Sequence, residues 1–280
     1  MKIKNTDGTE TVYSVLGEAA NPAMVLLHGI GADHTMWQPQ MAEFARNGFY
    51  VLAPDLLGHG QSSKVKQLAL PDWENQIVDL LRAHQQETSI LVGVSMGGVI
   101  AQSFAINHPE MVSQLVVSDT FAELKTPLER ALGLSQVIGF WLFKLLGPAA
   151  MAKGMTSAYQ APFAQPAKDY FSQMALEADF EQLILARRAI NRINVVEQLK
   201  KLKTPTLVMV GDQFGDFFIA INRKIANAVE DARFVVLNEA MDPSNLVNPA
   251  SFNRETLKFL HEKPPAYQGS ALGLINGDKI

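Results

Sequence analysis

The segment Gly93-Val94-Ser95-Met96-Gly97 places a serine directly after an apolar run and directly before a helical pattern. A G-x-S-x-G turn between a strand and a helix holds its serine in a strained backbone conformation, with the hydroxyl exposed at the helix N-terminus. Such a hydroxyl is a nucleophile for acyl transfer once a base accepts its proton. We therefore predict that Ser95 is the catalytic nucleophile. The alternative is a glycine-rich turn that contains a serine by chance.

A second motif, His28-Gly29-Ile30-Gly31, follows the apolar run 23–27. A loop of this kind supplies one backbone N–H to an oxyanion hole, and the residue after the nucleophile supplies the other. The expected donors are therefore Ile30 and Met96. We interpret His28 as shaping this loop rather than acting as the base. The polar turn at 54–62, Pro-Asp-Leu-Leu-Gly-His-Gly-Gln-Ser, is interpreted as structural.

A β-sheet would have to position these motifs, and the alternation of apolar and amphipathic runs along the chain predicts one. From residue 11 to about 118 short apolar runs alternate with longer amphipathic ones, which is typical of βαβ units. Strands are predicted at 11–16, 23–27, 49–53, 89–94 and 114–118, and helices at 35–46, 72–86 and 96–107. The alternation resumes with strands at 206–210 and 233–237 and helices at 219–229 and 252–261.

Residues 120–203 show helical patterns only. A block of this length between two strands of one sheet is longer than any loop and requires its own packing. We interpret it as a helical lid over a core formed by 1–119 and 204–263. Residues 264–280, rich in proline and glycine, have the composition of a C-terminal extension.

Composition narrows the class of partner. The chain has 280 residues, a net charge of -4 and no cysteine. It therefore lacks a basic field for nucleic acid and cannot form disulfides or thiolate metal sites. We expect no cofactor and no metal. The longest apolar stretch is interrupted by Lys144, Gly147 and Pro148, which argues against a membrane span, and the polar N-terminus has no signal-peptide pattern. A cytoplasmic location is the default expectation.

The motif order H-G-I-G, P-D-L-L-G-H-G-Q-S, G-V-S-M-G-G, helical insertion and two further strand–loop units resembles the α/β-hydrolase superfamily, over the chain to about Lys263. The resemblance implies an α/β fold with a mostly parallel eight-stranded sheet flanked by helices. It also implies a triad in the chain order Ser, acid, His and carboxylesterase-like chemistry under a lid. Members of this superfamily also include lyases, dehalogenases, cofactor-free oxygenases and receptors, so the fold alone does not set the reaction.

Other residues occupy the two positions at which the resemblance places the acid and the histidine. The acid position, three residues after the glycine that ends the penultimate strand, is Phe214. Asp212 and Asp216 flank it, and a small loop shift would bring either carboxylate inward. The histidine position, in Ala240-Met241-Asp242, is Asp242.

An ordinary aspartate is a poor substitute for the histidine. Its reference pKa lies about 2.6 units lower, which forfeits roughly 3.5 kcal/mol of driving force for proton transfer. Loss of a triad member leaves about 10³- to 10⁴-fold catalysis over water. Fast ester hydrolysis therefore requires a non-standard proton relay.

Two further residues are candidates for that relay. His34 begins the helix after the oxyanion loop, near the expected pocket mouth, where it would contact Ser95 or a ligand, or else the lid. Asp119 ends the strand 114–118, where some members of the superfamily keep their acid. Without a histidine to orient, Asp119 is expected to bond the pocket floor or the Asp242 loop.

The predicted lid is rich in large apolar side chains, namely Phe140, Trp141, Phe143, Met151, Met155 and Phe163. Such stripes on helices are more often core than pocket, but together they predict an apolar cavity over Ser95. Trp141 and Phe214 are the predicted substrate contacts. A small apolar carbonyl compound is the expected ligand.

The sequence is compatible with three functions. The first is a serine hydrolase of ester-like substrates that uses Ser95 with Asp242, Asp119 or His34 in the relay. The second is a catalytically impaired relative that binds a ligand without turnover. The third is a cofactor-free lyase or isomerase in which Asp242 abstracts a proton from carbon.

Overall fold

A computed structural model describes residues 1–262, which contain one eight-stranded sheet of order β1-β2-β4-β3-β5-β6-β7-β8. β1 and β2 pair antiparallel, and β3 to β8 run parallel. The strands are β1 Lys2–Lys4, β2 Glu10–Leu16, β3 Ala23–Leu27, β4 Tyr50–Pro54, β5 Ser89–Val94, β6 Val112–Ser118, β7 Thr206–Gly211 and β8 Ala232–Leu237. This is the mostly parallel α/β sheet that the sequence pattern predicts.

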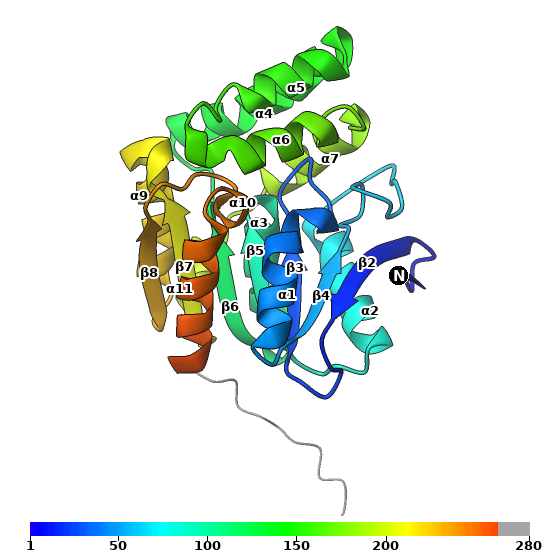
Figure 1. Cartoon of the computed structure of the whole chain (residues 1–280), viewed down its shortest axis with the longest axis vertical. Coiled ribbons are helices and arrows are strands. Elements are labelled where there is room, and N and C mark those ends of the chain that lie inside the picture. The colour runs from blue at the N-terminus through cyan, green and yellow to red at the C-terminus, as the bar shows by residue number, and fades with distance from the viewer. Residues whose placement is uncertain (263–280) are drawn as a thin grey trace, which may run out of the picture.

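Helices cover both faces of the sheet (Figure 1). The two faces have separate cores because side chains alternate along a strand. In β3, Met24 and Leu26 pack with Trp37 on one side, and Val25 and Leu27 pack on the other. The flanking helices are α1 Gln38–Arg46, α2 Leu70–Ala83, α3 Met96–Asn107, α8 Val196–Leu199, α9 Gly215–Ala228, α10 Ser244–Val247 and α11 Pro249–Glu262.

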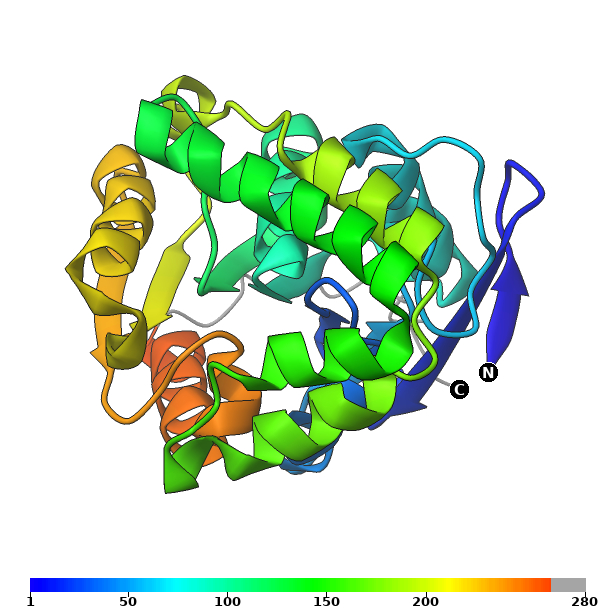
Figure 2. The ribbon, with the colours of Figure 1, turned by 90° about the horizontal axis from the view of Figure 1, so that it is seen from above.

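Four helices between β6 and β7 form a separate layer above the carboxyl ends of the parallel strands (Figures 1 and 2). They are α4 Pro127–Leu146, α5 Pro148–Thr156, α6 Gln165–Met174 and α7 Phe180–Ile190. α4 packs on α7 and α5 packs on α6. The segment is helical, as predicted, and its interpretation as a lid stays a prediction.

Element boundaries differ from the predicted ones where capping decides them. α2 begins at Leu70, two residues before the predicted start, because the Asp72 carboxylate accepts the backbone N–H of Ala69. The predicted helix 35–46 is divided into a short 3-10 turn, His34–Trp37, and α1. The strand Lys2–Lys4 was not predicted. The proposed C-terminal extension lies outside the described residues.

Within residues 1–262, every helix is too short or too polar to cross a membrane.

Candidate active site

Ser95 lies in the tight turn between β5 and α3, where it has φ 55° and ψ −115°. This positive φ is strained for a residue with a side chain. The flanking glycines make the turn possible, since a Cβ on Gly97 would lie 2.0 Å from the carbonyl oxygen of Leu27, and one on Gly93 would lie 2.3 Å from that of Gly97. The local sequence therefore dictates the geometry that presents Ser95.

The two expected backbone donors lie beside this serine. A Cβ on Gly29 would be 3.5 Å from the Cβ of Ser95, so the Gly29–Ile30 loop passes close to Ser95. Gly29 and Ile30 line the same cavity as Ser95. Met96 is the first residue of α3, where a backbone N–H has no acceptor within the helix. The position of Ile30 and Met96 suits an oxyanion hole, and that role stays a prediction.

His28 supports the loop, as expected. Its Nδ1 donates to the carbonyl oxygen of Gly29 at 2.8 Å, and its Nε2 accepts the backbone N–H of Leu56 at 3.0 Å. The ring of His59 packs edge-on against it. Both ring nitrogens of His28 are therefore engaged by neighbouring backbone groups.

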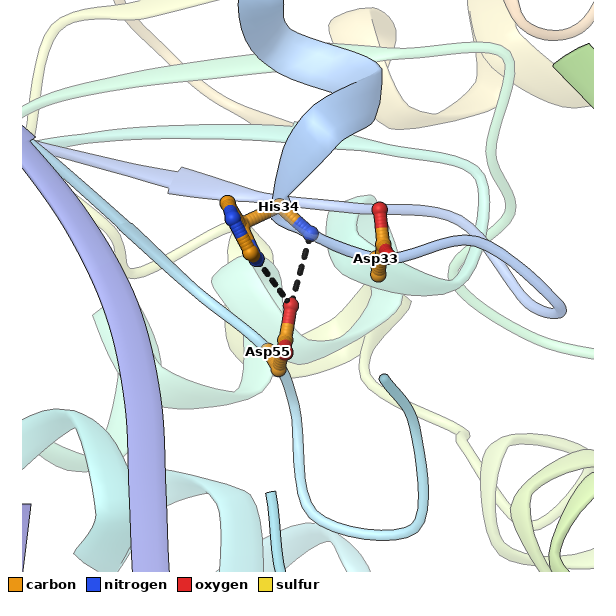
Figure 3. A group of neighbouring side chains, drawn as sticks. All are labelled: Asp33, His34 and Asp55. Atoms are coloured by element: carbon orange, nitrogen blue, oxygen red, sulfur yellow. Dashed lines mark hydrogen bonds and ion pairs between the residues drawn. The ribbon is translucent and has the colours of Figure 1, made fainter. Parts of the chain in front are cut away.

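His34 does not reach Ser95. Its backbone N–H and its Nδ1 both donate to Oδ1 of Asp55, at 2.8 and 2.6 Å (Figure 3). This hydrogen bond raises the pKa of His34. The neighbouring carboxylate of Asp33 accepts the hydroxyl of Tyr170 at 3.0 Å. The three grouped side chains in Figure 3 thus brace the loops, and His34 is absent from the lining of the Ser95 cavity.

Asp242 lines the same cavity as Ser95, and the nearby Ser95 side chain influences the pKa of the Asp242 carboxyl. The hydroxyl of Tyr159, from the helical layer, donates to the carbonyl oxygen of Asp242 at 2.8 Å. Burial and the charge of nearby Asp119 raise the pKa of Asp242 well above its ordinary value, while Ser95 and Arg187 act in the opposite direction.

Asp119 is buried at the end of β6, where it is 1% exposed. Its carboxylate accepts the backbone N–H of Gly211 at 2.9 Å and that of Ser244 at 2.8 Å, together with the hydroxyl of Ser118 at 3.0 Å. Burial raises the pKa of Asp119, and these bonds oppose the rise. The predicted bond from Asp119 to the Asp242 loop is present.

Phe214, the residue three positions after Gly211, lies outside the lining of the Ser95 cavity. Phe214 is 40% exposed and reaches the cavity only through its contact with Phe218. The loop shift considered for the flanking carboxylates is not seen: Asp212 accepts the side-chain amide of Gln213 at 2.8 Å, and Asp216 is exposed. Asp212 also accepts the backbone N–H of Ala240 at 3.3 Å, so within the 3-10 turn Asp212–Phe214 it braces the loop before Asp242 and is absent from the cavity lining.

A cavity of about 410 Å³ lies over Ser95. Phe140 and Phe143 line it, whereas Trp141 is 45% exposed and lies outside the lining. The helical rotation of about 100° per residue explains the difference, because positions three apart share a face and the residue between them does not. The placement expected for Trp141 is therefore wrong: Phe140 and Phe143 of α4 line the cavity instead.

Arg187 is a cavity residue that sequence reasoning missed. It projects from α7, is 4% exposed, and lines the cavity with Ser95 and Asp242. Within residues 1–262 its Nε and Nη2 have no hydrogen-bond partner. The sequence shows only Arg187-Arg188 in a helical pattern, which is typical of a solvated face. The available signal was that Leu183, Ile184 and Ile190, which lie three or four residues away along the helix, put Arg187 on the apolar face.

Comparisons with known proteins agree with this architecture. A family model described as the alpha/beta hydrolase fold matches residues 22–181. The chain is similar to 3-oxoadipate enol-lactonase 2 of Acinetobacter baylyi, with 26% identity over 250 residues that cover 86% of this chain and 89% of the relative.

Solved structures give the same result. A hydrolase from Pseudomonas aeruginosa PA01 matches with a TM-score of 0.81 and 26% identity, over 93% of this chain and 97% of that one. The enol-lactonase from Burkholderia xenovorans LB400 matches with a TM-score of 0.81 and 24% identity, over 93% and 100% of the two chains, a likeness that concerns the fold.

Proposed function

Because the chain belongs to the α/β-hydrolase family, we propose that it hydrolyses small, largely apolar carbonyl compounds of the ester class, with Ser95 as nucleophile and Asp242 as proton acceptor. The observation that carries the proposal is that Ser95 and Asp242 line one cavity, close enough for the serine side chain to influence the pKa of the Asp242 carboxyl. Asp119 is a positioning residue that acts through the Asp242 loop and through its charge.

The raised pKa of Asp242 supports this assignment. An ordinary aspartate lacks about 3.5 kcal/mol of driving force relative to histidine. Each unit by which the pKa rises restores about 1.4 kcal/mol of that deficit, and a base is most effective when its pKa lies near the working pH. Burial beside Asp119 thus brings a carboxylate toward the basicity of an imidazole.

The proposed steps conserve protons. Ionised Asp242 accepts the Ser95 proton as Oγ bonds to the carbonyl carbon, and the oxyanion receives hydrogen bonds from the N–H groups of Ile30 and Met96. Collapse breaks the bond to the leaving alkoxide, which takes the proton from Asp242. Water then attacks the acyl-enzyme, with Asp242 accepting its proton and returning it to Oγ.

The cavity lining supports a small substrate with apolar parts. Phe140, Phe143, Met155 and Phe218 are among the apolar side chains that line the cavity with the serine. We propose that the helical layer acts as a lid, because exclusion of water strengthens each electrostatic contact with the reacting carbonyl.

The test is ester turnover and covalent labelling of the purified protein. Short and medium p-nitrophenyl esters and a fluorophosphonate probe are offered to the wild type, to Ser95→Ala, and to Ser172→Ala. Ser172 serves as the control because its hydroxyl bonds the carbonyl of Lys168 on α6, outside the cavity lining. Labelling and turnover lost only in Ser95→Ala support the proposal. Absence of both in the wild type would instead indicate a ligand-binding relative or non-hydrolytic chemistry.

A further inference from the structure

The side chain of Arg187 carries a buried cation into the apolar cavity. Buried arginines are normally paired with a carboxylate or fully hydrogen-bonded, because desolvation of an uncompensated charge is costly. Among residues 1–262, the Nε and Nη2 atoms of Arg187 find no acceptor. The nearby Asp242 acts on Arg187 only through its charge, and no ion pair joins the two in the described part of the chain.

The two unpartnered nitrogens have a particular geometry. Nε and Nη2 form one edge of the planar guanidinium, and their parallel N–H bonds match the two oxygens of a carboxylate. The guanidinium lies 5.3 Å from the ring of Phe121, a cation–π contact that orients the plane. The Arg187 side chain thus lines the cavity, and no described protein group uses its buried bidentate edge.

We propose that Arg187 binds a carboxylate of the substrate, so that the natural substrate is an ester-like carbonyl compound bearing an acid group at the other end of a short apolar spacer. Ser95, Asp242 and Arg187 line one cavity of about 410 Å³, which is large enough for such a molecule. The apolar wall receives the spacer. The reaction in this inference rests on the proposed function, whereas the carboxylate binding does not.

Matched esters test the inference. Mono-p-nitrophenyl glutarate is compared with p-nitrophenyl 5-methylhexanoate, in which an isopropyl group replaces the carboxylate at equal length. We expect kcat/KM to favour the carboxylate ester by about 10- to 100-fold, the range for charge-assisted hydrogen bonds. The succinate and adipate monoesters vary the spacer.

Three variants assign the effect to the residue. Arg187→Met should remove the preference for the carboxylate ester, and Arg187→Lys should retain only part of it because a lysine cannot form the fork. Arg188→Met is the matched control, since Arg188 is the exposed neighbour on α7 and should keep the full preference. Thermal unfolding verifies that each variant is folded.

Binding without turnover separates this inference from the proposed function. Calorimetry measures wild type and Arg187→Met with 5-oxohexanoate and with its neutral counterpart 6-methylheptan-2-one. Selective binding of 5-oxohexanoate that Arg187→Met loses supports the inference even if no ester is hydrolysed. Ester turnover with no carboxylate preference at any spacer length overturns the inference and leaves the hydrolase proposal standing. Absence of both carboxylate preference and 5-oxohexanoate binding overturns it as well.

Discussion

The Asp119 carboxylate accepts the backbone N–H of Ser244 at 2.8 Å and thereby fixes the loop that carries Asp242. This bond joins the end of β6 to the segment after β8, across β7 of the sheet. It places two carboxyl groups close enough for the charge of one to raise the pKa of the other. Five predictions rest on this pair of carboxyl groups and on the turn at Ser95.

Replacement of Asp242 by asparagine should lower kcat/KM for p-nitrophenyl butyrate by about 10²- to 10⁴-fold, the usual contribution of a general base. Asparagine has similar volume but cannot accept the serine proton. Steady-state kinetics measures the loss, with Asp216→Asn as control because Asp216 is exposed. Equal activity of Asp242→Asn and wild type would exclude Asp242 as the base.

The rate should rise with pH through a midpoint well above the ordinary aspartate range of about 3.9. The base form of Asp242 is the ionised one, and its pKa is raised by burial and by Asp119. Asp119→Asn removes a negative charge and should move the midpoint of kcat/KM to lower pH. A midpoint that stays in place would show that another group controls the profile.

The raised pKa of Asp242 should also make the folding stability of the protein fall as pH rises. The raised pKa of Asp242 means that the unfolded chain releases this proton at lower pH than the folded protein does. The stability associated with the protonated carboxyl is full below the unfolded pKa of about 3.9 and is lost as pH rises toward the folded pKa. The melting temperature of Asp242→Asn relative to wild type should therefore increase from pH 4 upward. A constant difference over this range would contradict the raised pKa.

Asp242→His alone should raise ester hydrolysis at least about tenfold, because it places an imidazole between Ser95 and Asp119. Adding Phe214→Asp should give no further gain, since Phe214 is exposed and lies outside the cavity lining. Kinetics of the single and double variants decide between the two acid positions. If activity rises only when both substitutions are present, the acid of the triad belongs at position 214 and not at Asp119.

Gly97→Ala should destabilise the fold by at least about 3 kcal/mol, because the added Cβ would meet the carbonyl oxygen of Leu27 at 2.0 Å. Gly139→Ala on α4 is the control. A Cβ there meets nothing within 4 Å, and alanine favours a helix over glycine by about 1 kcal/mol. Denaturant unfolding measures both. Similar stabilities would mean that the turn at Ser95 relaxes more easily than this contact indicates.

The sequence by itself determined what depends on local patterning. The strand before Ser95 and the helix after it are encoded by apolar runs, and the glycines on either side are the only residues that fit so tight a turn. The same local logic located the Ile30 loop, the parallel sheet and the helical segment between β6 and β7.

Only the tertiary structure decided which distant side chains meet. Asp119 reaches the Asp242 loop because β6 and β8 flank β7, whereas His34 bonds Asp55 in a neighbouring loop. Helical rotation sends Trp141 outward and Arg187 into the cavity. Burial, which no sequence pattern measures, raises the pKa of Asp242. Ser95 marks the site from sequence alone, but its partners depend on packing between segments far apart in the chain, and packing sets both their distances and their charge states.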